Sequence, residues 1–351
     1  MGGEVAAMGD GRAAPPARVP GWPAAGHGAR TGPAGMPGPA EMEGSESMPA
    51  TAAQPIAANP ATAADPAGEP ATAAAITAGA AVQASGENFP VALRLLPGRY
   101  RYHLAALYGF ARSADDMGDE APPGDRLRLL DELEADLGRL YDTASPMPRV
   151  GVVRALAPMV ARCRVPAQPF LDLIQANRQD QAVSRYQSYE DLAGYCRLSA
   201  NPVGRVVLYI FGAATPDREA LSDRVCTALQ LAEHWQDVAE DYRAGRIYLP
   251  QADLARFAVS EAELAAPSAG PRLRELMEFE VRRARELLAD GAVLTGTLRG
   301  AARAAVAGYV AGGRAALAAI AAAGYDPLWA TPRPDKRRLA AELMRTYATG
   351  R

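Results

Sequence analysis

The sequence predicts an all-α fold for most of the chain, and three observations lead to this prediction. From Glu87 onward, Leu, Ala, Arg and Glu recur at three- and four-residue spacing, which is the period of an amphipathic helix. Alternating runs of β-branched residues are scarce, and turn-forming residues separate the periodic segments. The predicted helices span residues 96–119, 125–141, 149–163, 168–178, 188–198, 200–213, 217–243, 270–290, 292–323 and 334–347.

Proline-containing turns set the boundaries of these helices, because proline cannot continue a helix through its own position. The turns are Pro122-Pro123-Gly124, Ser145-Pro146, Val165-Pro166, Thr215-Pro216 and Leu249-Pro250. Asp217 and Ser222 are candidate caps for helix 217–243, since short polar side chains accept hydrogen bonds from the first amides of a helix.

The first 85 residues differ in composition from the rest of the chain. They contain no Leu, Phe or Tyr, and the first leucine is Leu93. Such a segment buries too little apolar surface to offset its ordering entropy. We therefore predict a disordered Ala/Pro/Gly-rich tail over residues 1–85 and one helical catalytic domain over residues 86–351.

Charge and cysteine content exclude several classes of function. With 37 basic and 40 acidic residues the net charge is -3, so no general attraction to nucleic acid or an anionic membrane is expected. Cys163, Cys196 and Cys226 form no C-x-x-C pair, which disfavours a zinc site or a disulfide framework. The chain has no secretory signal and no uninterrupted apolar window of spanning length, so a cytoplasmic protein is expected.

Two acidic clusters lie within predicted helices. In the first, Asp115 and Asp119 are four residues apart, so both carboxylates leave the same helix face. In the second, Glu233, Asp237 and Asp241 are spaced as one acidic stripe on helix 217–243, beside apolar residues. Like charges at this spacing repel, and a divalent cation would reverse that effect, since magnesium prefers oxygen ligands.

One such pair alone more often marks a solvated helix face than a metal site. Two pairs, each within an apolar helix, make a magnesium site for a phosphorylated ligand as plausible as solvated faces. The residue pattern does not decide between these two interpretations.

At these residues the chain resembles the squalene/phytoene synthase family, over about residues 86–330. The matching segments are Asn88-Phe-Pro, Leu95-Leu-Pro97, Tyr108 to Asp119, Tyr195 to Gly204, Gln230 to Asp241, Gly245 to Pro250 and Gly324-Tyr-Asp326. The resemblance implies an isoprenoid-synthase-type helical bundle with a central cavity, and two or three magnesium ions that bind a prenyl diphosphate.

Carried over by position, the resemblance also implies residue roles. Asp115 and Asp119 would hold magnesium from one side, and Asp237, Asp241 and Glu233 from the other. The residues expected to contact the substrate or its diphosphate are Tyr108, Arg112, Gln230, Asn88, Asn201 and Arg246. The two asparagines lie beside apolar residues, and a buried amide needs partners.

The finer resemblance is to the hydroxysqualene synthases of bacterial hopanoid pathways, through Glu87 to Ala92 and the His234-Trp235-Gln236-Asp237 stretch. It implies ionisation of presqualene diphosphate and capture of the carbocation by water, without a nicotinamide. A condensing prenyltransferase that makes presqualene diphosphate, squalene or a phytoene-type product is the first alternative. A non-catalytic assembly factor is the second, which four repelling carboxylates disfavour.

The sequence departs from the family pattern at two positions. Glu233 stands where the family usually has a metal-binding Asn, and Gln236 stands where it usually has Arg. The loss of that Arg suggests a site that handles one diphosphate. The substrate's apolar chains predict transient contact with the inner face of the membrane, and the pathway predicts functional coupling to other squalene-pathway enzymes.

Overall fold

The computed structural model describes residues 96–351, which are helical and contain no β-strand apart from one isolated bridge between Arg185 and Ile247. The all-α prediction is confirmed for these residues, whereas the predicted tail and Asn88 lie outside them. The helices are α3 (Gly98–Asp119), α4 (Arg126–Tyr141), α5 (Gly151–Cys163), α6 (Gln168–Asp180), α7 (Tyr189–Ser199), α8 (Asn201–Ile210), α9 (Pro216–Gln236), α10 (Val238–Arg243), α11 (Gln251–Arg256), η1 (Glu261–Ala265), α12 (Pro271–Ala292), α13 (Leu294–Thr297), α14 (Gly300–Ala322) and α15 (Lys336–Thr349).

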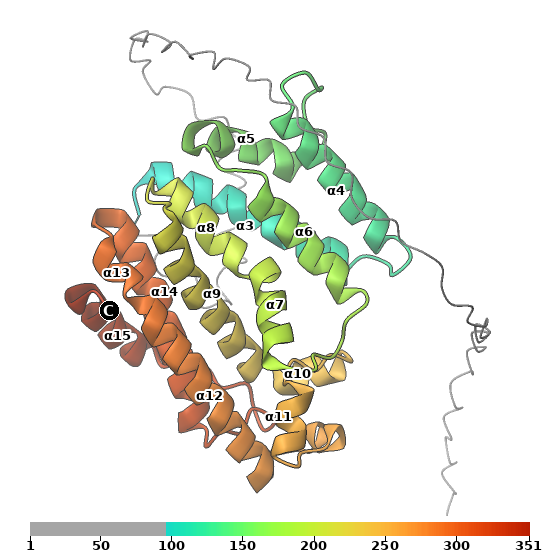
Figure 1. The fold of residues 1–351 in the computed structure, drawn as a ribbon, viewed down its shortest axis with the longest axis vertical. Helices are drawn as coiled ribbons and strands as arrows, with labels where there is room; N and C mark the ends of the chain where they lie inside the picture. The colour runs from blue at the N-terminus through green and yellow to red at the C-terminus, as the bar shows by residue number, and fades with distance from the viewer. Residues whose placement is uncertain (1–95) are drawn as a thin grey trace, which may run out of the picture. The chain divides into compact units, whose positions relative to one another are not determined.

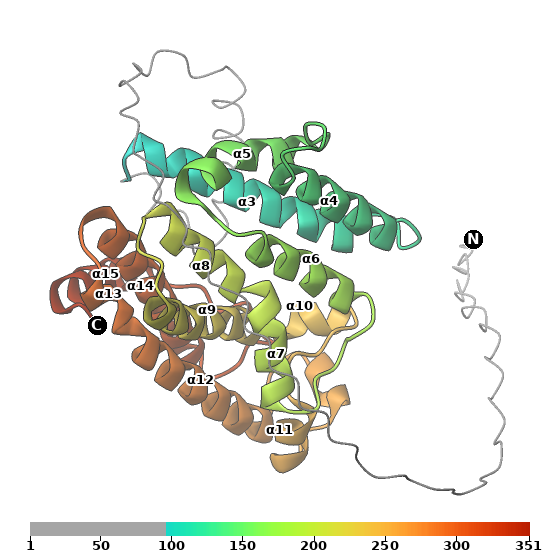
Figure 2. The same ribbon diagram turned by 45° about the horizontal axis from the view of Figure 1, so that its top comes forward.

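Two apolar clusters hold the helices together. One joins α3 to α4, α5, α6 and α8, and its centre includes Phe110 and Phe170, whose rings meet edge-on at 5.2 Å. The other joins α7, α9, α12 and α14 around the fully buried Trp235. Figures 1 and 2 show α3, α4 and α5 on one side of α8 and α9, with α12 and α14 on the other.

Helix α9 ends earlier than the sequence predicted. The expected helix 217–243 is interrupted at Asp237, whose backbone has φ -104° and ψ 15°. The amide of Asp237 closes α9 on the carbonyl of Glu233 at 3.0 Å, and its carbonyl accepts from the amide of Asp241 at 2.9 Å to begin α10. Aspartate favours helix ends over helix interiors, which accounts for the interruption.

The N-terminus of α9 also differs from the prediction. Thr215 is the cap, and its side chain accepts from the amide of Arg218 at 3.3 Å, while Pro216 takes the first helical position. Asp217 lies in the first turn, where a negative charge favours the positive end of the helix dipole. Ser222 is buried inside the helix and is not a cap.

The predicted helix 292–323 is likewise divided. Gly300 has φ +55°, a left-handed conformation that glycine adopts without steric cost, and it separates α13 from α14. The sequence analysis missed α11 and η1, which are too short to show a helical period. A capping box formed by Ser260 and Glu263 begins η1.

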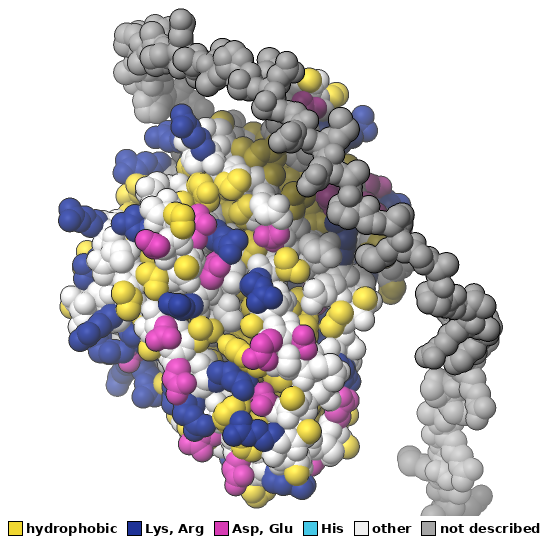
Figure 3. Space-filling view, viewed as in Figure 1, with side chains coloured by type: hydrophobic (Ala, Val, Ile, Leu, Met, Phe, Trp, Pro, Cys, Tyr) yellow, Lys and Arg dark blue, Asp and Glu magenta, His cyan; other side chains and the backbone are white. Residues whose placement is uncertain are grey.

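Helix α14 is long and apolar enough to span a membrane by length and composition, although no spanning helix was predicted. Its most apolar window is 61% buried, and it packs against α9, α12 and α15. This helix therefore has the character of a core helix. On the face in Figure 3, basic and acidic side chains are largely interspersed, as expected for a nearly balanced charge.

Helix α9 is fixed closely against α12 through Gly291. A methyl group at Gly291 would lie 2.8 Å from the backbone nitrogen of Val225 and 2.9 Å from the carbonyl oxygen of Leu221, nearer than Cβ atoms approach other groups. The absence of a side chain at this position therefore allows the short distance between the two helices, and α9 carries Gln230 and Glu233 and ends directly before Asp237.

We predict that Gly291→Ala lowers the free energy of unfolding by about 1–3 kcal/mol, because α9 and α12 must move apart. Thermal unfolding followed by circular dichroism would measure this. Gly138→Ala is the matched control, since nothing lies within 4 Å of the added methyl group in α4. That variant should be neutral or stabilised by up to about 1 kcal/mol. Equal melting temperatures for the two variants would contradict the close packing.

Candidate active site

A cavity of about 420 Å³ lies between the two apolar clusters, within the usual range for small-molecule sites. Along α9 its lining changes from Val225 and Leu229 to Glu233 and Asp237. Along α3 it likewise ends in Asp115 and Asp119. The cavity therefore has an acidic end, where these helices terminate, and an apolar remainder lined by Val203, Val207, Leu208, Leu294 and Val306.

The four predicted aspartates all line this cavity. Asp115 and Asp119 come from the last turn of α3, whereas Asp237 lies at the α9–α10 junction and Asp241 on α10. The two pairs are more than 100 residues apart in the chain, and the fold brings them to the same end of one cavity. Glu233 lines it as well and is exposed.

Three of the predicted aspartates at the acidic end, Asp115, Asp237 and Asp241, have raised pKa values. Burial, with the charge of Asp237 as the next cause, raises the pKa of Asp241 to about 7. Asp115 is open to the cavity, yet desolvation by the surrounding protein raises its pKa to about 6 despite a hydrogen bond from Asn177. Burial and Glu240 raise the pKa of Asp237. The ionised forms of these carboxyl groups are therefore less favoured than they are in water.

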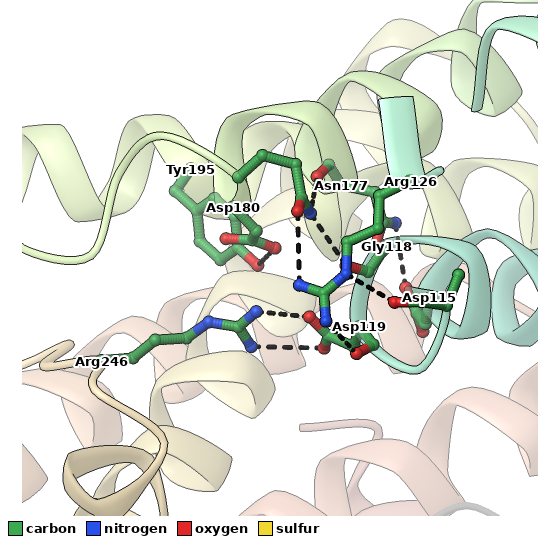
Figure 4. A network of polar contacts seen from close by, with 10 residues as sticks. Asp115, Gly118, Asp119, Arg126, Asn177, Asp180, Tyr195 and Arg246 are labelled. Atoms are coloured by element: carbon green, nitrogen blue, oxygen red, sulfur yellow. Dashed lines mark hydrogen bonds and ion pairs between the residues drawn. The ribbon is translucent and has the colours of Figure 1, made fainter. Parts of the chain in front are cut away.

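Arg246 crosses the acidic end and pairs with Asp119. Its guanidinium donates to both carboxylate oxygens, with Nη1 3.2 Å from Oδ2, as Figure 4 shows. This bond raises the pKa of Arg246. The Arg246 amide also donates to the carbonyl of Asp241 at 2.8 Å, so the cation is tied to the α10 segment. One positive charge thus bridges the two acidic helices.

Helix α6 fixes the end of α3. Asn177 Nδ2 donates to Asp115 Oδ1 at 3.0 Å, and Gln181 Nε2 donates to the carbonyl of Gly118 at 2.9 Å. A methyl group at Gly118 would meet Asn177 Oδ1 at 2.6 Å, so only glycine allows this approach. Arg126 donates to the carbonyl of Asp119 at 2.7 Å (Figure 4). The first aspartate pair is therefore held in a defined position.

The structure adds Asp180 and Asn177 to the cavity, which the sequence analysis did not identify as site residues. Asp180 accepts from the hydroxyl of Tyr195 at 2.8 Å, and burial raises its pKa to about 6. Leu173, Asn177 and Asp180 share one face of α6 at i, i+4 and i+7, and that spacing was the available signal. It was missed because α6 carries one carboxylate on this face and no pair.

An aromatic cluster lies beside the acidic end. His234 stacks on Tyr248 with ring centroids 3.7 Å apart, and Tyr195 and Tyr186 lie within 6 Å of the Tyr248 ring. Burial, with Arg246 as the second cause, lowers the pKa of His234 to about 3, so the imidazole is neutral at physiological pH. His234 Nε2 is 3.4 Å from Gln230 Nε2, and both residues line the cavity.

The remaining predicted residues divide into two groups. Tyr108, Arg112 and Gln230 line the cavity, and Arg112 is engaged by Asp116 at 2.7 Å and Glu120 at 2.6 Å. Asn201 does not line the cavity, contrary to expectation. It is buried and its Oδ1 accepts from Thr227 at 2.9 Å, so its amide joins α8 to α9.

Gln236 also lies away from the cavity lining. Its side chain is buried, and Nε2 donates to the carbonyl of Pro332 between α14 and α15. The neighbouring residues Trp235 and Asp237 point elsewhere, because successive residues on a helix are rotated by about 100°. The placement of Gln236 therefore gives no support to the idea that it marks a lost diphosphate contact.

Within residues 96–351, no three Asp, Glu, His or Cys side chains converge closely enough to form a ready metal cage. The residues suited to a divalent cation are the two aspartate pairs. Magnesium usually takes one or two protein carboxylates together with waters and substrate phosphates, so separated pairs match its preference better than a closed cage would. Burial, with neighbouring carboxylates as a smaller cause, raises the pKa values of Asp115, Asp237 and Asp241, so a cation bound there would favour their ionised forms.

Known proteins with similar sequences belong to one family. The model of the squalene/phytoene synthase family matches residues 82–344. The chain is 37% identical over 219 residues to a hydroxysqualene synthase of Rhodopseudomonas palustris, covering 61% of this chain and 72% of that one. It is 33% identical over 214 residues to a phytoene synthase of Arthrospira platensis, covering 57% of this chain and 68% of that one.

The fold has a counterpart among solved structures. The crystal structure of the squalene synthase HpnC from Alicyclobacillus acidocaldarius superposes with a TM-score of 0.66 at 39% identity. The match covers 73% of this chain and 97% of that one. The helical arrangement that forms the cavity is therefore shared with a relative over almost its whole length.

We predict that the metal-free protein becomes less stable as the pH rises from 5 toward 8. The pKa of Asp241 is about 7 in the folded protein against an ordinary value of 3.8, so between these values the folded state binds more protons than the unfolded state. Thermal melts in a chelator across this pH range would measure the slope.

Asp241→Asn should reduce that slope, because Asp241 has the most strongly raised pKa among the carboxyl groups that line the cavity. Asp125→Asn is the control, since Asp125 lies outside the cavity and pairs with Arg128 on the surface. A slope that Asp241→Asn leaves unchanged would show that the carboxyl groups of the cavity do not carry this pH dependence.

Proposed function

The chain belongs to the squalene/phytoene synthase family of enzymes, and from this premise we propose that it converts presqualene diphosphate and water into hydroxysqualene and diphosphate. In this reaction the carbon–oxygen bond to the diphosphate breaks and its electron pair leaves with the diphosphate. The carbocation rearranges, the oxygen of water bonds to it, and one proton of that water is released.

The observation that carries the proposal is the division of one cavity into an acidic end and an apolar remainder. Presqualene diphosphate has the same division, with an anionic diphosphate and long apolar chains. Two aspartate pairs and Arg246 surround the end where the leaving group would lie. Val203, Val207, Leu294 and Val306 provide the apolar surface for the chains.

The family generally depends on a divalent metal ion, and the aspartate pairs are suited to two or three magnesium ions. Magnesium bound there would neutralise the charge that develops on the departing diphosphate. The protein's own residues perform the other tasks. Arg246 is positioned to exchange its bond to Asp119 for one to the diphosphate, and Asn177 keeps Asp115 oriented toward the cavity.

The cation formed on ionisation would lie near the aromatic cluster. The faces of Tyr195 and Tyr248 offer π electrons to a positive charge without providing a nucleophile. For the capturing water, Ser199 Oγ and Asp180 Oδ1 are buried oxygens that have no partner among the described residues, and both residues line the cavity. They are suited to hold that water.

The second candidate function is condensation of two prenyl diphosphates. Similarity to a phytoene synthase and to a squalene synthase favours it, since both names describe condensing enzymes. The same acidic end would serve either reaction. A non-catalytic assembly role has less support, because it gives no reason for keeping repelling aspartates around a cavity.

We predict that purified protein with Mg²⁺ and without a nicotinamide forms hydroxysqualene from presqualene diphosphate and nothing from farnesyl diphosphate. Mass spectrometry of extracts from separate reactions would identify the products. Presqualene diphosphate or a C30 hydrocarbon formed from farnesyl diphosphate would instead establish the condensing function. Absence of product from both substrates would favour the assembly role.

The single substitutions Asp115→Asn and Asp237→Asn should each lower kcat/KM by about 100-fold or more, since charge stabilisation of the leaving group contributes several kcal/mol. Asp131→Asn is the matched control on the surface of α4, where Asp131 pairs with Arg178 outside the cavity. Equal activity of the Asp115, Asp237 and Asp131 variants would refute the assignment of the acidic end.

A further inference from the structure

Arg185 lies in the connection between α6 and α7, and its side chain holds the turn that precedes Arg246. Arg185 Nη1 donates to the carbonyl oxygen of Gly245 at 2.7 Å. That carbonyl belongs to the peptide bond whose amide is the amide of Arg246, and this amide donates to the carbonyl of Asp241 at 2.8 Å. Both polar groups of the peptide bond that leads into Arg246 are therefore bonded.

Glu261, the first residue of η1, fixes the direction of the Arg185 guanidinium. Its two carboxylate oxygens accept from Arg185 Nε at 2.9 Å and from Nη2 at 3.1 Å, which is the two-point geometry that a planar guanidinium and a carboxylate favour. Arg185 Nη1 also donates to the carbonyl of Ser184 at 2.8 Å, and Gln251 Nε2 donates to Glu261 Oε1 at 3.2 Å. All three guanidinium nitrogens are therefore engaged, and Nη1 is the one that holds the turn.

Backbone hydrogen bonds, and not buried side chains, fix this turn. Residues 243–245 are exposed. Gly245 has φ +84°, a left-handed conformation that glycine adopts without steric cost. After the turn, the amide of Ile247 donates to the carbonyl of Ser184 at 3.0 Å. The place of Arg246 at the acidic end of the cavity therefore depends on bonds between this backbone and the connection that carries Arg185.

We propose that Arg185 is a positioning residue for Arg246, and that Glu261 orients Arg185 for this task. The inference rests on the proposed function, in which Arg246 exchanges its bond to Asp119 for one to the leaving group. A side chain that changes partners reaches both of them only when its backbone stays in place. Arg185 does not line the cavity and its guanidinium nitrogens are already engaged, so it acts through the peptide bond that it holds and not by contact with the substrate.

Binding of inorganic pyrophosphate with Mg²⁺, measured by titration calorimetry, reports on Arg246 without requiring turnover. Arg246→Ala should weaken binding by about 30-fold, as expected for the loss of a charge-assisted hydrogen bond. Arg185→Ala should weaken it by about fivefold, because the side chain of Arg246 remains but its backbone is no longer held. Arg185→Lys should recover part of that loss, since an ammonium group can still donate to the carbonyl of Gly245.

A double-mutant cycle separates positioning from a general structural effect. In the Arg246→Ala background, Arg185→Ala should cause no further loss of pyrophosphate affinity. The matched control is Arg272→Ala, which breaks another arginine–glutamate pair of η1, with Glu263 at 3.2 Å, and should bind like the original protein.

Glu261→Gln provides a milder test should Arg185→Ala fail to fold. It keeps the volume and removes the charge that orients the guanidinium, and it should weaken pyrophosphate binding by roughly threefold. Thermal melts of each variant would show that the folded protein is being compared.

Unchanged affinity in Arg185→Ala, or in Glu261→Gln where that variant stands in for it, would overturn the inference. An equal loss from Arg185→Ala with and without Arg246 would overturn it as well, because the effect would then not pass through Arg246. Failure of the original protein to bind pyrophosphate would reject both the acidic end as a diphosphate site and this inference. The expected pattern of binding without turnover of presqualene diphosphate would leave the inference standing and remove only the proposed reaction.

Discussion

The crowding of partly desolvated carboxylates around one cavity is the constraint on which the other features depend. The helices cannot separate to relieve it, because Gly291 lets α9 pack closely on α12, and α6 holds the end of α3 through Asn177 and Gln181. Burial, with repulsion from neighbouring carboxylates as a smaller cause, raises the pKa values of Asp115 and Asp241, and Arg246 pairs with Asp119. A cation bound at this end would offset both the desolvation of these carboxylates and the repulsion between them.

The apolar remainder of the cavity lies opposite this charged end, so a substrate with one charged and one apolar part could bind in only one orientation. An ionised substrate would have its leaving group among carboxylates and cations, and its reactive carbon among Tyr195, Tyr248 and aliphatic side chains. Polar atoms also interrupt that surface, among them Ser199 Oγ and Asp180 Oδ1, and Asp180 accepts from the hydroxyl of Tyr195 in the aromatic cluster. In the proposed reaction, these polar atoms would be the places where water could reach the cation.

The sequence predicted the helical class and most helix boundaries, because each leaves a periodic signal along the chain. The aspartates around the cavity followed from the resemblance to the family, because their paired spacing alone fits a metal site and solvated helix faces equally well. It did not predict the break at Asp237, since the acidic stripe fits a continuous helix as well as an interrupted one. Asn201 and Gln236 were expected at the site only because they occupy positions in the family's motifs. In the structure Asn201 bonds to Thr227 and Gln236 to Pro332, and such contacts depend on tertiary packing that the sequence pattern does not reveal. Asp180 was missed because its partner Tyr195 lies on another helix.

The interruption of the helix at Asp237 divides the acidic residues Glu233, Asp237 and Asp241 between two segments of the chain. Glu233 belongs to α9, which packs in the apolar core, whereas Asp241 and Arg246 belong to a segment that is tied to residues 184–187 through the amides of Ile247, Gln251 and Ala252. Asp237 is the joint between them. Substitutions in the segment that contains Asp241 and Arg246 can therefore change the positions of these two residues without repacking the core around α9. Evolution could in this way alter the acidic end of the cavity while the helical fold is kept.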